Sequence, residues 1–206
     1  TGAQNTAVGH QALYANTTAD NNTAMGYDAM EDNTTGANNT AIGAQALKDN
    51  TTGTQNDAFG YTTMSANTTG AYNAAFGSLA AVSLNGGNRN TFCGNSAGSG
   101  VTTGSDNTLL GYKAGNSCTT GANNVAIGKE ALYQNSTGGE NIAIGRQAFY
   151  ATSTNSQNIA IGYRAGYVNT ASDVVFVGHE CGYANTTGHR NTSVGHRAAM
   201  QTTTGT

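Results

Sequence analysis

Three of the four histidines, residues with metal-binding and acid–base chemistry, lie near the C-terminal end of the chain. His179 and His196 are 17 residues apart in a repeating sequence, so we expect their rings to be neighbours on one surface. With His189 they offer the ligand type that zinc prefers. No cysteine or carboxylate completes a recognised spacing around them, and Tyr, Lys or Arg fills the equivalent place elsewhere. We therefore expect solvated surface here, with no metal and no cofactor.

The three cysteines do not form a pattern that predicts a disulfide framework or a metal site. Cys93, Cys118 and Cys181 lie at three different places of the repeating unit, and no CxxC pair occurs. We expect small core-filling or tolerated residues. No nucleophile recurs or clusters with a base, and near-identical repeats offer no unique catalytic pocket, so we expect that the protein is not an enzyme.

The tyrosines suggest a second kind of chemistry. A tyrosine combines an apolar ring face with a polar tip, which suits stacking against sugars. The candidate ligand-binding residues on this basis are Tyr14, Tyr27, Tyr61, Tyr112, Tyr133 and Tyr163. The alternative, which we favour, is an aromatic ladder that stabilises stacked repeats.

All these residues are positioned by a unit of 17 residues that recurs from end to end. One copy reads Asn39-Thr40-Ala41-Ile42-Gly43, continues with Ala46-Leu47 and reaches the turn Asn50-Thr51-Thr52-Gly53. Counted from its first Asn, each copy has an apolar residue at position four, a glycine at position five and a small residue at position eight. There are twelve copies, and the eleventh begins one residue early, at Val174. Residues 1–206 therefore form a single repeat array.

The repeat predicts an all-β fold in which each copy is one coil of a parallel β-solenoid. A helix pair would need about 30 residues. Two short strands of about four or five residues, with two bends, account for one coil. Because side chains alternate along a strand, we expect position four to face the core, opposite position eight. The Asn at position one should form a hydrogen-bonded column, and the glycine should permit a bend or a close backbone approach.

Composition narrows the possible partners. Charged residues make up 9% and the net charge is −3, so nucleic-acid binding, which needs a basic stripe, is not expected. No run approaches the roughly 18 apolar residues of a membrane-spanning helix, so we expect no membrane insertion of this segment. Thr1-Gly2-Ala3-Gln4 matches Thr52-Gly53-Thr54-Gln55, and residues 203–206 stop inside a turn, which suggests an excerpt of a longer fibre.

The core string resembles a known class of repeats. Asn124-Val125-Ala126-Ile127-Gly128-Lys129-Glu130-Ala131 is similar to the head repeats of trimeric autotransporter adhesins. The full unit, with its Asn-Thr-Thr-Gly turn, looks still more like the arrays of phage tail-fibre proteins, where a self-cleaving chaperone domain of the endosialidase type often follows. The resemblance covers residues 1–206 and implies a left-handed parallel β-roll that assembles as a three-chain rod.

The predicted core also favours an oligomer. One medium apolar side chain and one Ala per coil return far less free energy on burial than ordering a whole coil costs. Asn ladders must help, and a second apolar face, formed by positions three and nine, would pack against neighbouring chains. We expect a homotrimer, with a monomeric solenoid as the alternative.

Three functions suit such an array. The first is a structural rod segment of an extracellular or virion fibre (a phage tail fibre or a bacterial surface adhesin) that supports attachment to a host or a surface. The alternative is an adhesin whose own surface binds cell-surface glycans. An ice-binding solenoid is less expected, because the Thr pairs are adjacent residues beside turns and point to opposite sides. Asn-x-Thr sequons, which would carry glycans only in a eukaryotic secreted chain, occur at Asn16, Asn33, Asn50, Asn67 and Asn185.

Overall fold

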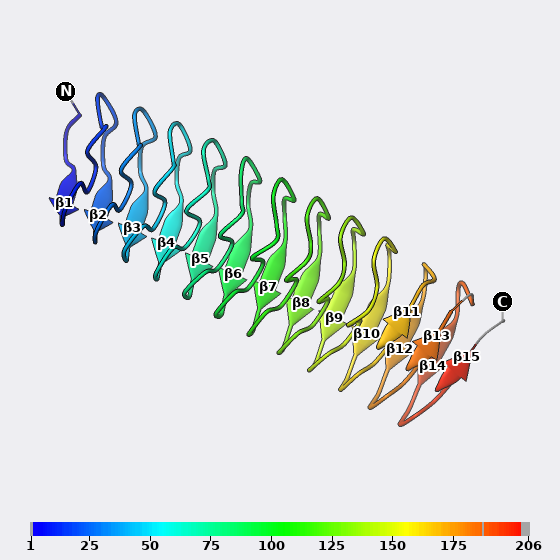
Figure 1. Ribbon diagram of the computed structural model, residues 1–206. Helices are drawn as coiled ribbons and strands as arrows, with labels where there is room; N and C mark the ends of the chain where they lie inside the picture. The colour runs from blue at the N-terminus through cyan, green and yellow to red at the C-terminus, as the bar shows by residue number, and fades with distance from the viewer. Residues whose placement is uncertain (1, 187, 203–206) are drawn as a thin grey trace.

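The computed structural model describes residues 2–186 and 188–202, and in this part the chain is a β-solenoid of stacked coils (Figure 1). The predicted all-β, parallel fold with one coil per repeat is confirmed. The predicted C-terminal turn at residues 203–206 and one residue of the turn at 185–188 lie outside the described residues. One long sheet takes a three-residue strand from each copy: β1 (Thr6–Val8), β2 (Thr23–Met25), β3 (Thr40–Ile42), β4 (Asp57–Phe59), β5 (Ala74–Phe76), β6 (Thr91–Cys93), β7 (Thr108–Leu110), β8 (Val125–Ile127), β9 (Ile142–Ile144), β10 (Ile159–Ile161), β12 (Val175–Val177) and β14 (Thr192–Val194).

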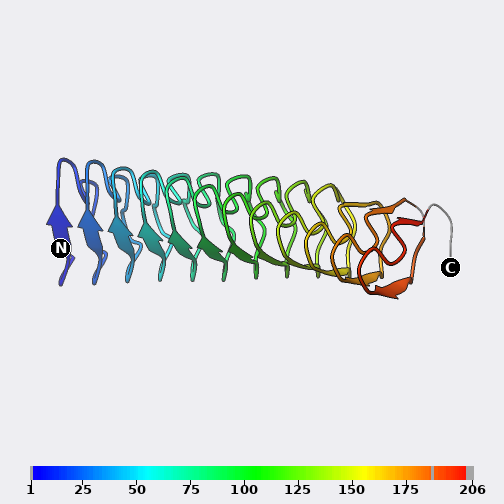
Figure 2. The ribbon, with the colours of Figure 1, turned by 90° about the horizontal axis from the view of Figure 1, so that it is seen from below.

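Every strand of this sheet pairs with its neighbours in parallel, and equivalent positions of consecutive copies lie side by side. Ala41 of β3 is paired with Ala58 of β4, for example. The register survives the early start of the eleventh copy, because Ile159 of β10 still pairs with Val175 of β12. The shortened turn before Val174 absorbs the missing residue. The coils thus stack into an elongated rod, with β1 near one end and β15 near the other (Figure 1 and Figure 2).

Position three, and not position four, faces the core, so this part of the prediction is wrong. Ala41 is fully buried, whereas its neighbour Ile42 is 36% exposed on the outer face of the sheet. Ala46 and Leu47, at positions eight and nine, are also fully buried. Leu47 already fills the thin interior of its coil, which leaves room for only a small side chain at position three. The expected second face of positions three and nine is therefore the core itself.

Residue volumes inside the coils are complementary. Where position three is large, position nine is glycine, as in the pair Phe92 and Gly98. A Cβ atom on Gly98 would lie 2.3 Å from Cε1 of Phe92, far inside van der Waals contact. The same relation holds between Phe176 and Gly182, where the added Cβ would lie 2.5 Å from the ring. In these coils the large core residue therefore lies at position three instead of position nine.

Each coil contains one strand in the long sheet rather than the two strands expected. Positions seven and nine adopt positive φ, as at Gln45 (59°) and Leu47 (51°), and this left-handed conformation cannot continue an extended strand. The return side still bonds from coil to coil, since the N–H of Leu47 donates to the carbonyl of Thr63 at 3.0 Å. Paired strands on this side occur only towards the end of the described chain: β11 (Val168–Asn169), β13 (Ala184–Asn185) and β15 (Gln201–Thr202).

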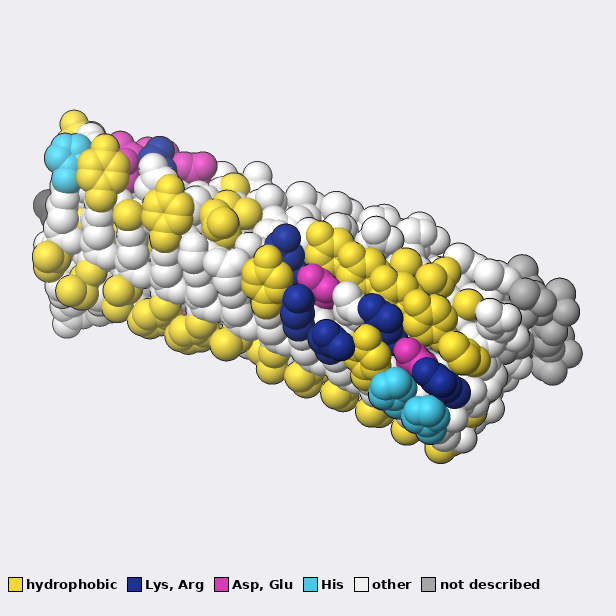
Figure 3. Space-filling view, turned by 60° about the horizontal axis from the view of Figure 1, so that its bottom comes forward, with side chains coloured by type: hydrophobic (Ala, Val, Ile, Leu, Met, Phe, Trp, Pro, Cys, Tyr) yellow, Lys and Arg dark blue, Asp and Glu magenta, His cyan; other side chains and the backbone are white. Residues whose placement is uncertain are grey.

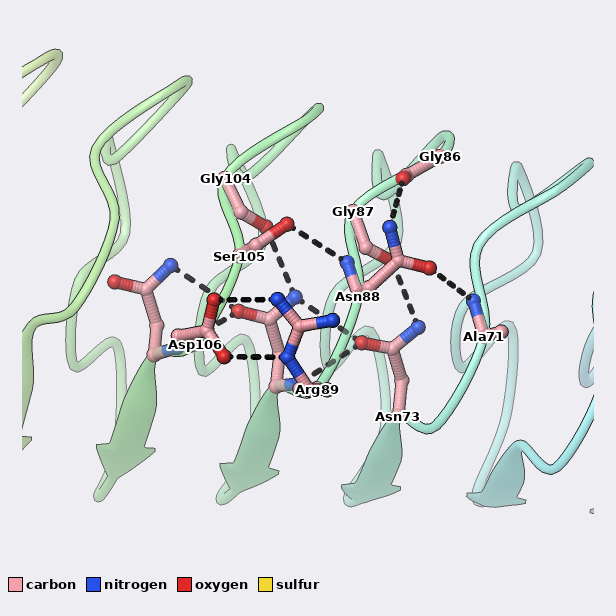
Figure 4. A network of polar contacts seen from close by, with 11 residues as sticks. Ala71, Asn73, Gly86, Gly87, Asn88, Arg89, Gly104, Ser105 and Asp106 are labelled. Atoms are coloured by element: carbon pink, nitrogen blue, oxygen red, sulfur yellow. Dashed lines mark hydrogen bonds and ion pairs between the residues drawn. The ribbon is translucent and has the colours of Figure 1, made fainter.

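The Asn column at position one forms the predicted ladder. The side-chain amide of Asn39 donates to Oδ1 of Asn22 at 3.2 Å and to the carbonyl of Gly53 at 2.8 Å. Oδ1 of Asn22 also accepts the backbone N–H of Asn39 at 2.9 Å. Figure 4 shows a later rung, in which Asn73 donates to the carbonyl of Gly87 at 2.8 Å. These amides satisfy buried backbone groups that no strand partner reaches.

A second Asn column at position twelve carries the predicted sequons. The amide of Asn50 donates to Oδ1 of Asn33 at 2.8 Å and to the carbonyl of Gly53 at 3.0 Å. Asn33, Asn50, Asn67 and Asn185 are fully buried. A glycan would be attached to the same nitrogen that makes these bonds, so the folded solenoid has no room for one at these four residues.

The glycine at position five permits the predicted close approach of successive coils. Gly43 has a φ of 138°, and a Cβ atom added to it would lie 2.3 Å from the carbonyl oxygen of Gly60 in the next coil. No other residue type fits there without moving the backbone.

Candidate binding surface

The most continuous apolar feature on the outside is the column of position-four side chains, which we call the position-four stripe. Exposure ranges from 36% for Ile42 to 69% for Val194 among its more exposed members. Neighbouring members touch along the rod, as the rings of Phe59 and Phe76 stack with centroids 4.9 Å apart. The stripe consists of Val8, Met25, Ile42, Phe59, Phe76, Cys93, Leu110, Ile127, Ile144, Ile161, Val177 and Val194. Such a long exposed apolar surface is typical of an interface.

The stripe widens towards the C-terminal half of the rod. Position two also points outwards, and it changes from Thr in the first copies to aliphatic residues later: Val125, Ile142, Ile159 and Val175. Cys93 is exposed within the stripe, whereas Cys118 and Cys181 are buried. The prediction of core-filling cysteines is therefore confirmed for two of the three.

The six predicted tyrosines lie in different coils and do not converge on one site. Tyr14 and Tyr61 are exposed, and Tyr27 stacks on His10 with ring centroids 5.1 Å apart. The other three lie in the C-terminal half. There Tyr112 contacts two lysines, Tyr163 two arginines, and Tyr133 another tyrosine: Lys113 and Lys129, Arg146 and Arg164, and Tyr150.

Four tyrosines at position ten form the aromatic ladder that we favoured. The ring centroids of Tyr133, Tyr150, Tyr167 and Tyr183 are 5.0, 5.0 and 5.1 Å apart in succession, and the rings are almost parallel. Because their faces cover one another, the ladder presents ring edges and hydroxyl groups to solvent. Sugars cannot stack on the faces between these rings, so any contact with a sugar must involve the edges and the hydroxyls.

A group of cationic side chains lies beside this ladder (Figure 3). It holds five of the eight Lys and Arg residues of the chain, namely Lys113, Lys129, Arg146, Arg164 and Arg197. Only two carboxylates, Glu130 and Glu180, share positions six and seven of these coils. Together with Tyr112, Tyr163 and the ladder, these cations form what we call the cationic–aromatic patch. It is locally positive on a chain whose net charge is −3.

Polar contacts hold part of this patch in place. Gln147 donates to Glu130 at 2.8 Å and accepts from Nε of Arg164 at 2.9 Å. Arg197 pairs with Glu180 at 2.8 Å, and this hydrogen bond lowers the pKa of the Glu180 carboxyl below its usual value. At position seven, Arg197 is thus paired with a carboxylate, whereas Arg164 is held by a neutral amide.

The two cations at position six, Lys129 and Arg146, are only partly compensated. The guanidinium of Arg146 lies 4.4 Å from the ring centre of Tyr163 and, among the described residues, has no carboxylate within ion-pair distance. Nζ of Lys129 lies 3.8 Å from Glu130. Both side chains are exposed, so their donors remain available to an external anion.

His179 and His196 stack as expected, with ring centroids 5.0 Å apart. His189 is engaged elsewhere, where its Nδ1 accepts the backbone N–H of Ser172 at 3.2 Å. Within residues 2–186 and 188–202 no group of three His, Cys, Asp or Glu side chains could hold a metal ion. In the same part of the chain no helix is long and apolar enough to cross a membrane.

Sequence reasoning missed an open groove over the second to fifth coils. It has a volume of about 560 Å³ and places amide, carboxylate and ring groups together, but no nucleophile beside a base. Its lining residues are Asn38, Gln55, Asp57, Tyr72, Asn73 and Ala74. It also missed that Arg164, at position seven, would lie 5.1 Å from the ring centre of Tyr167 in the tyrosine ladder.

No protein-family model, no curated protein and no solved structure matches this chain. The proposals below therefore depend on the repeat, on the two surface columns and on the chemistry of the patch.

Proposed function

We propose that this chain is a structural rod segment of an extracellular or virion fibre, such as a phage tail fibre or a bacterial surface adhesin, that supports attachment to a host or a surface. The observation that carries the proposal is the unbroken register of twelve paired strands along one axis. Each coil is held by its two neighbours, and equivalent tyrosines recur every 5.0 Å, so chain length converts directly into fibre length.

We further propose that three copies associate side by side through the position-four stripe. Three chains with their stripes turned to a common axis would remove from water the apolar side chains that a single chain exposes, from Val8 to Val194. The parallel sheet supports this arrangement because buried parallel sheets are normally covered on both faces. The number three comes from the likeness of the string at residues 124–131 to trimeric head repeats.

Solution scattering by the isolated chain tests this function. We expect a particle with the mass of three chains and the length of one, because the copies lie alongside each other. A length that grows in proportion to mass would mean end-to-end association and would contradict the side-by-side rod. A particle with the 20.8 kDa mass of one chain would contradict the oligomer.

A further inference from the structure

We propose that the cationic–aromatic patch is a binding surface for a linear acidic polysaccharide that lies along the rod axis. The patch adjoins the stripe but lies on another face of the coils (Figure 3), so chains joined through their stripes would leave it open to solvent. The inference goes beyond the rod function, since a rod without any ligand would still be a rod.

The first argument is that free donors for an anion are already held in place. Arg146 packs one face against Tyr163 at 4.4 Å, which orients its planar fork without using its N–H groups on a carboxylate. A guanidinium in this state can donate two parallel hydrogen bonds to a carboxylate or a sulfate. Lys129, one coil earlier at the same position, adds a second charge.

The second argument is the match between the spacing of the patch and a sugar chain. Equivalent groups recur along the axis every 5.0 Å, as the ladder at Tyr133, Tyr150 and Tyr167 measures. This repeat is close to the length that one pyranose unit occupies in an extended polysaccharide. Arg164 lies 5.1 Å from the rings of both Tyr163 and Tyr167, so it connects the cationic column to the ladder. Tyrosine hydroxyl groups on the edge of the ladder can exchange hydrogen bonds with sugar hydroxyls.

The third argument concerns charge density. Five cations against two carboxylates give a modest positive excess over six coils. A DNA duplex carries one negative charge per roughly 1.7 Å of its axis, so its binding would need many more cations per length of rod than the patch has. A polysaccharide with one carboxylate or sulfate per one or two sugar units suits this density better.

Binding of defined polymers to the full chain tests the proposal. The probes are polygalacturonate (carboxylate), heparin oligosaccharide (sulfate), neutral dextran and single-stranded DNA, each measured at low salt and at about 0.15 M ionic strength. We expect binding to one or both acidic polysaccharides that weakens with salt, and none to dextran. A comparison of polygalacturonate with heparin shows whether the patch binds carboxylate or sulfate groups.

A matched pair of variants separates a site from general charge attraction. The double variant K129Q/R146Q removes two charges from the patch, and K48Q/R89Q removes two charges that lie outside it. Position six is Ala, Ser or Asn in other coils, so glutamine fits there. We expect binding to weaken about tenfold in K129Q/R146Q and to stay within about twofold of the wild type in K48Q/R89Q.

Three results would overturn the inference. One is the absence of binding to both acidic polysaccharides at low salt, and another is an equal loss in the two double variants. The third is binding to DNA as tight as binding to the polysaccharides. None of these results would affect the rod, which scattering tests separately.

Discussion

The Asn amides contribute most at the scale of single residues, because each one satisfies backbone groups of a neighbouring coil. The carbonyl of Gly53 accepts from both Asn39 and Asn50, so two columns meet at one buried oxygen. A buried carbonyl without a partner costs about 1–3 kcal/mol. The repeated Asn is thus explained by local hydrogen bonding within the coil stack.

Replacement of one Asn in the position-one column should destabilise the rod. Asn73 donates to Asn56 and Gly87 and accepts from the backbone N–H of Asn90. We expect N73A to lower the free energy of unfolding by about 2–4 kcal/mol in urea denaturation, since two backbone groups lose their partner. The exposed N95A, at a position that is Ala in the third coil, should change it by less than about 0.5 kcal/mol. If N73A and N95A lowered the free energy of unfolding equally, the Asn column would not stabilise the rod as described.

Cys118 gives a test by pH. Burial raises the pKa of its thiol from the ordinary 9.0 to about 11. The folded state therefore favours the neutral thiol, and its contribution to stability is complete below pH 9 and is lost as the pH rises towards about 11. Val101 fills the same position in the preceding coil, so C118V is a matched substitution.

Relative to C118V, the wild type should lose about 1 kcal/mol of stability between pH 8 and about pH 10. Urea denaturation of both proteins at the two pH values measures this difference. A difference between the proteins that does not change with pH would show that the thiol is not buried as described.

At this scale the sequence predicts the ladder and the close approach at position five, because both depend on residues that every copy keeps. The direction of position four was not predictable from alternation alone. A strand of three residues has an inner and an outer face whichever way it is turned. The same alternation would be seen if Ile42 were buried and Ala41 exposed, whereas in the structure Ala41 is buried and Ile42 is exposed.

At the scale of the coil, the complementary volumes at positions three and nine decide that direction. Phe92 lies opposite Gly98, and Ala41 lies opposite Leu47. A comparison of the two columns along the sequence would have revealed that they share one interior. The single strand per coil was harder to foresee. Leu47 at a φ of 51° costs about 1–2 kcal/mol, and this conformation is kept by its packing in the core and by its hydrogen bond to the next coil.

An exchange of volumes tests this account of the coil. F92A should destabilise by about 3–5 kcal/mol through the cavity that it leaves. G98L should also destabilise, because its side chain enters the space of the Phe92 ring. The double variant F92A/G98L recreates the Ala–Leu pair of the third coil and should return to within about 1.5 kcal/mol of the wild type. Thermal or urea unfolding measures the three variants. If the double variant lost as much stability as F92A and G98L together, positions three and nine would not share one interior.

At the scale of the whole molecule, the exposed stripe and the patch give the rod two different outer faces. The stripe is apolar along its full length, while the patch is cationic and confined to the C-terminal half (Figure 3). The period of the sequence predicts the rod. It does not predict the stripe or the patch, because both depend on which side of each strand points outwards.

Cys93 provides a natural probe of the stripe, because it is the one described cysteine that is exposed. If stripes face one another, two thiols from different chains can lose two protons and two electrons to a copper–phenanthroline oxidant and form a disulfide. We expect a linked two-chain species on non-reducing gels, and none in C93S. Linked species in C93S, or none in the wild type under conditions that oxidise a small thiol, would argue against the facing stripes.

The mass of the chain in solution tests the central claim most directly. Sedimentation equilibrium should give three times the 20.8 kDa chain mass for the wild type. The double variant I127D/I161D, which places charges in the stripe, should give the mass of one folded chain, and T120D/T137D, which adds the same charges at exposed turns, should remain a trimer. A wild-type mass of 20.8 kDa at every concentration, or a trimer that survives I127D/I161D, would contradict the proposal that the stripe joins three chains into a fibre.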